Sequence, residues 1–217
     1  MNFSVYFFAL FMLTSKLYSQ TTDSNINPKG KLFIGSEVGY NNIISKTDNK
    51  HSFQGGILGE YYFSKRWSIL GKIKYYKTGV NFYKPDTHTG SMFDLGSDEY
   101  KGNFEGEIIS IPINLKWEFD IYKKLKANLK LGIAYNFETK SNYIDYSPNL
   151  VLDFPSNYLS TNESLGLSYF LKEYLALYVD CEFISGADKG YIPQLFGNKF
   201  YYVQNININL GFKYHLK

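Results

Sequence analysis

The residues of this chain that could carry out chemistry are carboxylates, lysines and asparagines that recur at every second position of apolar segments. They could form ion pairs with one another or line a narrow path for ions. The set comprises Glu37, Glu60, Lys72, Lys74, Asn114, Lys116, Asn128, Lys130, Asp180, Glu182, Asn205, Asn207, Asn209 and Lys213. Because four carboxylates nearly balance five lysines, we expect a packed polar plug rather than a path selective for one charge.

Catalysis has one candidate, a histidine in a long polar link. His88 lies near Asp86 and Ser91, which places a possible base beside a hydroxyl. Nothing in the sequence fixes the geometry of these groups, so we expect a protein that is not an enzyme. The histidines are also too scattered to form a metal site, since His51 and His215 belong to different segments. The sequence therefore predicts no catalytic residue, no cofactor and no metal.

The segment that contains the three neighbouring asparagines shows what must position this polar set. From 203 to 217 the chain alternates without a break, with Ile206, Ile208 and Leu210 on one face and the asparagines on the other. A period of two predicts a β-strand. One face is apolar and the other is rich in amides and charges, which is typical of a strand in a transmembrane β-barrel.

Seven earlier segments follow the same pattern, and each has the length that a tilted strand needs to cross a bilayer. They span 31–40, 52–63, 67–79, 106–118, 126–137, 163–171 and 174–184. The single cysteine, Cys181, falls on the apolar face of its segment. Pro112 lacks an N–H for the hydrogen-bond ladder, so we expect a β-bulge at that residue. Tyrosines and tryptophans near the strand ends, Tyr62 among them, predict aromatic girdles at the two membrane surfaces.

The links between these segments alternate in length. Links at 64–66, 119–125 and 172–173 are short, whereas those at 41–51, 80–105, 138–162 and 185–200 are long and polar. Short turns at one end and long loops at the other are typical of an up-and-down barrel. We therefore predict an all-β fold, an eight-stranded antiparallel up-and-down transmembrane β-barrel at 31–217.

The N-terminus predicts export from the cytoplasm. Its apolar run from Phe3 to Leu13 has the length of a signal peptide and is too short to span a membrane as a helix. We expect a signal peptide at 1–19, a short periplasmic segment at 20–30, and the barrel in the bacterial outer membrane. The net charge of +3 is spread along the chain, which argues against a nucleic-acid partner.

The chain also resembles a known group of proteins. GGILGEYYFSKRWSILGKIKYYKTG at 55–79, IISIPINLKWEF at 108–119 and the terminal LGFKYHL look like the porin-like outer-membrane barrel domain of Bacteroidetes, the PorT-like group. The matching positions are Gly71, Tyr75, Lys77 and Gly79, then Ile111, Pro112, Leu115 and Lys116. The resemblance covers nearly the whole chain after 1–19. It implies an outer-membrane barrel and, through this group, an accessory role in protein secretion.

The function that this pattern favours is non-enzymatic. We expect a monomeric membrane scaffold, or a surface or periplasmic interaction protein, whose loops or turns contact an envelope partner of unknown identity. Outer-membrane lipid surrounds such a barrel, and the barrel assembly machinery inserts it. A narrow passive pore, a PorT-like secretion accessory and a lipid-modifying barrel enzyme are the alternatives. A soluble secreted β-barrel that binds a ligand inside is a further alternative, and it predicts apolar residues facing inward.

Overall fold

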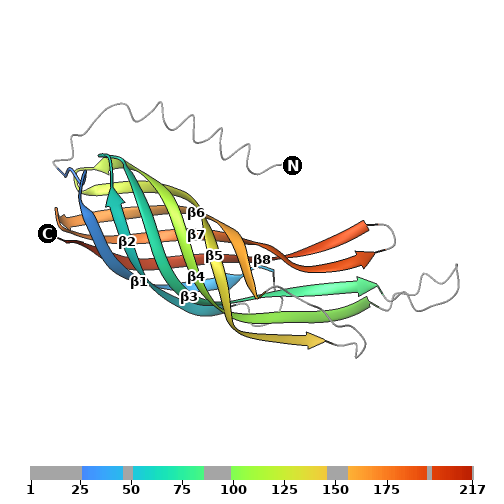
Figure 1. Cartoon of the computed structure of the whole chain (residues 1–217). Helices are drawn as coiled ribbons and strands as arrows, with labels where there is room; N and C mark the ends of the chain where they lie inside the picture. Colours follow the sequence, from blue (N-terminus) through green and yellow to red (C-terminus); the bar gives the residue numbers. More distant parts are fainter. Residues whose placement is uncertain (1–25, 46–50, 86–98, 146–155, 195–196, 217) are drawn as a thin grey trace, which may run out of the picture.

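Eight antiparallel strands form a closed barrel in which each strand pairs with its neighbours in sequence and β1 pairs with β8 (Figure 1). This computed structural model describes residues 26–45, 51–85, 99–145, 156–194 and 197–216. The strands are β1 (Leu32–Ile43), β2 (His51–Tyr62), β3 (Trp67–Pro85), β4 (Glu99–Tyr122), β5 (Leu125–Asp145), β6 (Asn157–Lys172), β7 (Leu175–Gln194) and β8 (Gly197–Leu216). The predicted fold is thereby confirmed. No helix in the described ranges is long and apolar enough to cross a membrane.

The alternation in the sequence separates two faces of the barrel wall. Residues such as Val38, Phe53, Leu131 and Ile133 are exposed on the outer face, although they are apolar. The polar residues between them are buried in the lumen. An apolar outer face around a polar interior is the reverse of a soluble barrel, and it fits a wall surrounded by lipid.

The strand register gives the barrel a steep tilt. A row of directly paired residues starts at Leu32 and returns to β1 at Asn42, ten residues farther along the same strand. The row runs through Tyr61, Ile69, Leu115, Leu131, Glu163, Phe183 and Ile206. This stagger, with eight strands, corresponds to a tilt of about 40° and to a lumen that side chains can fill.

The strands are longer than the sequence predicts at the end where the long links lie. β3 and β4 pair as far as Pro85 and Glu99, and β7 and β8 as far as Gln194 and Gly197. These hairpins and the end of β5 project beyond the barrel rim in Figure 1. The prediction failed there because backbone pairing continues outside the membrane, where no apolar face is needed and the period of two disappears.

Pro112 lies in β4 without a bulge, so that prediction was wrong. The register shifts of β4 against β5 fall at Glu107/Ile108 and Asp120/Tyr122, and Pro112 pairs directly with Ala134. On the other side, the β3–β4 pairs stop at Gly71↔Ile113 and resume in the same register at Lys74↔Ser110. The missing donor therefore interrupts the ladder to β3 locally and does not displace the strand.

Candidate functional site

The lumen contains two clusters of buried ion pairs. The first, which we call the basal cluster, lies toward the end with the short turns and comprises Glu60, Lys116, Glu118 and Lys213. Lys116 Nζ is 2.9 Å from Glu60 Oε1, and Lys213 Nζ is 2.8 Å from Glu60 Oε2. Glu118 Oε1 lies 2.5 Å from Lys116 Nζ. Two carboxylates and two ammonium groups leave this cluster neutral.

Hydroxyl groups complete the basal cluster. Ser68 donates to Glu60 Oε1 at 2.6 Å, and Lys213 donates to the Tyr62 hydroxyl at 2.6 Å. The Lys213 ammonium also lies 5.0 Å from the centre of the Tyr62 ring. Such contacts supply hydrogen bonds that the buried charges of Glu60 and Lys213 require.

The second cluster, the central cluster, joins opposite walls of the barrel. It comprises three carboxylates and three lysines: Glu37, Asp180, Glu182, Lys72, Lys74 and Lys130. Lys72 Nζ lies 2.8 Å from Glu37 Oε2 and 2.5 Å from Glu182 Oε1. Lys74 pairs with the same two glutamates, and Lys130 pairs with Asp180. All six residues are buried, and their charges sum to zero.

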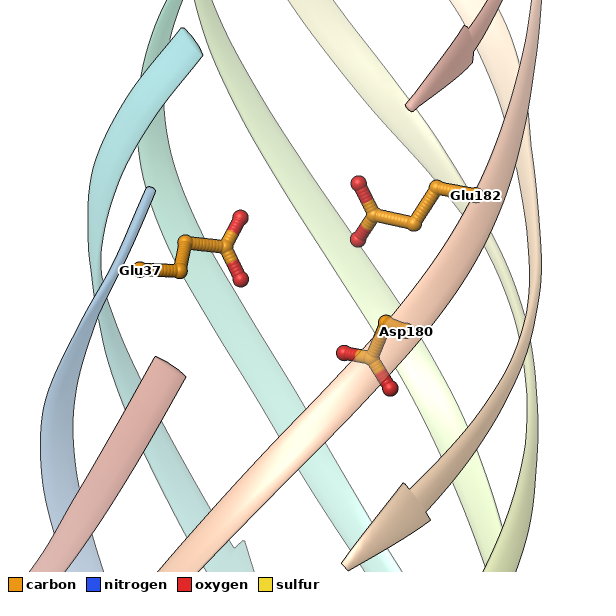
Figure 2. Close-up of side chains that lie close together, drawn as sticks. All are labelled: Glu37, Asp180 and Glu182. Carbon is orange, nitrogen blue, oxygen red and sulfur yellow. The ribbon is translucent and has the colours of Figure 1, made fainter. Parts of the chain in front are cut away.

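The carboxylates of the central cluster have the spacing of a metal site but are engaged by lysines. Glu37, Asp180 and Glu182 converge in the lumen (Figure 2), and one oxygen from each lies within 4.8 Å of the others. The Lys72 ammonium, however, contacts all three carboxylates, the farthest at 3.9 Å from Asp180 Oδ2. Tyr178 donates to Glu37 Oε2 at 2.9 Å. We therefore assign the convergence to ion pairing, because ammonium groups already neutralise the oxygens.

Apolar side chains close the lumen on both sides of the clusters. At the end with the short turns, Ile26, Phe33, Tyr62, Phe170 and Ala176 form one buried group. Toward the other rim a second group, the rim plug, consists of Tyr76, Val80, Phe104, Ile108, Tyr158, Ile184 and Val203. Water and ions that enter from either end therefore meet a group of packed apolar side chains.

Between the clusters lies a small cavity of about 10 Å³, which is roughly the space needed by a single water molecule. Residues from both clusters line it, including Glu60, Lys116, Lys72 and Asp180. Leu58, Leu70 and Tyr178 form an apolar group beside it. The cavity is too small for a solute.

The asparagines fill the remaining lumen. Asn205 exchanges hydrogen bonds with Thr78, Asn209 accepts one from Gln54, and Asn128 donates weakly to Ser168 at 3.5 Å. The amide groups of Asn114 and Asn207 have no hydrogen-bond partner among the described residues. Gly132 makes room for Asn114, because a Cβ atom at 132 would overlap the Asn114 side chain and the Ile113 carbonyl.

All fourteen residues of the predicted polar set are buried in the lumen. The prediction omitted Glu118, although it follows Lys116 on the same face of the predicted segment 106–118. Tyr62 was predicted at a membrane surface but is fully buried, since it follows Glu60 on the inward face. His88 and the segment 1–19 lie outside the described residues.

The apolar residues on the outer face form a band around the barrel. Charged residues mark the edge of this apolar band nearer the long links, which we call the upper edge. Glu107 of β4 pairs across the sheet with Lys77 and Lys140, and the Lys140 ammonium lies 3.4 Å from Glu107 Oε2. Tyr75 donates to the same oxygen at 2.7 Å. This hydrogen bond, together with the two lysines, holds the pKa of Glu107 below its usual value. Ile109 and Phe137 lie directly below this row on β4 and β5 and begin the apolar band.

Comparisons with known proteins support the fold. No protein-family model matches the chain, and no curated protein matches it by sequence. A major outer membrane protein from Thermus thermophilus matches in structure with a TM-score of 0.51 and 13% identity, covering 86% of this chain and 98% of that one. Neisserial surface protein A matches with a TM-score of 0.50 and 13% identity, covering 85% and 97%.

The resemblance to the PorT-like group stays a prediction. What the apolar band, the register and the two structural matches establish is the architecture. The fold is that of the eight-stranded β-barrels of bacterial outer membranes.

Proposed function

We propose that this protein is a non-conducting and non-enzymatic scaffold of the outer membrane, which holds recognition elements at the membrane surface. The observation that carries this proposal is the closure of the lumen. Two neutral ion clusters lie between two apolar layers, and the cavity between the clusters has room for about one water molecule. An interior of this kind stabilises a wall and offers no route for a solute.

The energetics of the clusters support this role. An ion that crossed the lumen would have to separate Lys72 from Glu37 and Glu182, all of which are buried. Removing one partner of a buried ion pair typically costs about 3–5 kcal/mol. Among the described residues, the two lumen clusters each carry equal numbers of positive and negative charges, so neither cluster would attract a particular ion.

The projecting strands supply the surfaces that a scaffold would present. β3, β4 and β5 extend beyond the rim on one side, and β7 and β8 form a second extension (Figure 1). Sheets that are anchored in a rigid barrel keep a partner-binding surface in a fixed orientation. An accessory role in protein secretion, as in the PorT-like group, would be one use of such a surface.

Conductance across a planar lipid bilayer tests the proposal. We expect the purified full-length protein to insert without producing current steps, while a porin inserted under the same conditions conducts. The shift in gel mobility between unheated and boiled samples shows that the inserted protein is folded. Reproducible single-channel currents from folded protein would replace the scaffold with the narrow passive pore.

A further inference from the structure

Glu163 places a carboxylate on the lipid-facing surface of the barrel. β6 alternates regularly, with Leu159, Thr161, Glu163 and Leu165 exposed on the outer face and Asn162 buried in the lumen. No described residue forms an ion pair or a hydrogen bond with the Glu163 carboxylate. Its directly paired neighbours, Leu131 on β5 and Phe183 on β7, are both apolar.

The register gives the depth of Glu163 in the membrane. The row of directly paired residues described above rises from Leu32, near the short-turn edge of the apolar band, to Asn42, near its other edge. Each step in this row passes from one strand to the next, and the row reaches Glu163 after five of its eight steps. Ten residues of a strand tilted by about 40° rise about 25 Å, which matches the height of a typical apolar band. Glu163 therefore lies about 16 Å above Leu32 and about 9 Å below Asn42 on this geometry.

A carboxylate that stays charged at this depth is costly unless a partner neutralises it. Ionisable residues inside the membrane are costly, and they usually mark a functional contact. Within the described ranges, Glu163 is the charged side chain that faces outward between the short turns and the Lys77–Glu107–Lys140 row. Lys77 and Lys140 lie above the apolar band, and both pair with Glu107. A second copy of this chain, in the same orientation, therefore offers no described cation at the depth of Glu163.

Lipid does not supply the missing charge either, because headgroup amines lie above the acyl chains. A lysine on another membrane-spanning protein can reach this depth, since its long apolar stem passes through hydrocarbon. Lysine also differs from arginine in being able to give its proton to the carboxylate, which leaves a neutral pair in a medium of low dielectric constant.

We propose that the β5–β7 outer face around Glu163 is the contact surface for a second outer-membrane protein, and that a lysine of that protein pairs with Glu163. Leu131, Leu165 and Phe183 surround the carboxylate and form the apolar part of the contact. This inference deepens the scaffold role proposed above and rests on it. It adds a partner interface within the membrane to the interfaces that the projecting strands could provide.

Zero-length cross-linking in native membranes tests the pair. Dicyclohexylcarbodiimide enters the bilayer and activates a carboxylic acid; a neighbouring amine then forms an amide, and the reagent leaves as its urea. We expect an amide between Glu163 and a lysine of another protein, identified by mass spectrometry of the linked peptides. The link should be lost in Glu163→Gln. It should persist in Glu107→Gln, which removes a carboxylate that already has lysine partners in its own chain.

Three results would overturn the inference. One is a Glu163 that carries only the N-acylurea of the reagent in native membranes, which means that lipid surrounds it. Another is a link between two copies of this chain. A bismaleimide would test for such a pair independently, because Cys181, the single cysteine, is exposed on β7 beside Leu165. The third is a heterologous link that survives in Glu163→Gln. None of these three results bears on whether the barrel conducts, so the bilayer assay still tests the scaffold proposal separately.

Discussion

Lys72 of β3 and Glu182 of β7 form an ion pair across the lumen, with Nζ 2.5 Å from Oε1, although 110 residues separate them in sequence. In a barrel whose strands follow sequence order, β3 and β7 lie on opposite walls. The pair therefore ties together two strands that share no backbone hydrogen bonds. Because Lys72 also contacts Glu37 on β1, one ammonium group connects three strands.

Replacing Lys72 with methionine should lower the free energy of unfolding by about 3–5 kcal/mol, because the change leaves a buried carboxylate without its cation. Urea titration in lipid vesicles measures the effect. The double variant Lys72→Met/Glu182→Gln should recover part of the loss, since it removes the uncompensated charge as well. The single variant Glu182→Gln completes the cycle, and a loss in the double variant equal to the sum of the two single losses would show that the two residues are not coupled.

Gly132→Ala should destabilise the barrel by about 1–3 kcal/mol, because its Cβ atom would overlap the Ile113 carbonyl and Asn114. Gly71 offers a matched control in the same barrel wall. A Cβ atom there faces outward and meets no atom within 4 Å. Gly71→Ala should therefore leave the urea midpoint almost unchanged. A similar loss in both variants would indicate a general effect of alanine and not the crowding at Gly132.

The sequence alone predicts the membrane-spanning part of this fold, because lipid and lumen impose opposite polarities on alternate residues. It predicts the inward position of residues such as Asn207 for the same reason. The partners in each ion pair depend on the stagger of the whole barrel, which no local pattern contains. Lys72 and Glu182 meet only because the register shifts by ten residues around the circle.

Two misassigned residues show where the sequence rules lose force. Tyr62 was placed at a membrane surface by residue type, yet its position in the alternation points it inward, where its hydroxyl accepts a hydrogen bond from Lys213. The assignment of Pro112 to a bulge followed from its missing donor, but the ladder tolerates one gap when neighbouring pairs hold the strand in register. In both cases the register of the strand was a better guide than the residue type.

Acid should weaken the outward Tyr75–Glu107–Lys140 contact. The pKa of Glu107 is lowered, first by the hydrogen bond from Tyr75 and then by Lys140 and Lys77. When the pKa of a carboxylate is lower in the folded state, the carboxylate stabilises the protein at pH values above its unfolded-state pKa of 4.5. This contribution to stability disappears as the pH falls through the folded-state pKa. The stability difference between wild type and Glu107→Gln should therefore be present at about pH 6 and vanish below the folded-state pKa. Urea midpoints at a series of pH values would measure it, and a difference that grew in acid would contradict the assignment.

Opening the rim plug alone should not make the barrel conduct. Phe104→Ala/Ile108→Ala removes two fully buried side chains of the plug, and the loss of packing should lower stability by several kcal/mol. The central cluster and the apolar group at the opposite end are left intact, so the bilayer should stay silent. Heat-dependent gel mobility would verify that the variant is folded. Steady currents from the folded variant would mean that the rim plug is the sole barrier, and that the ion pairs beneath it separate readily when water reaches them.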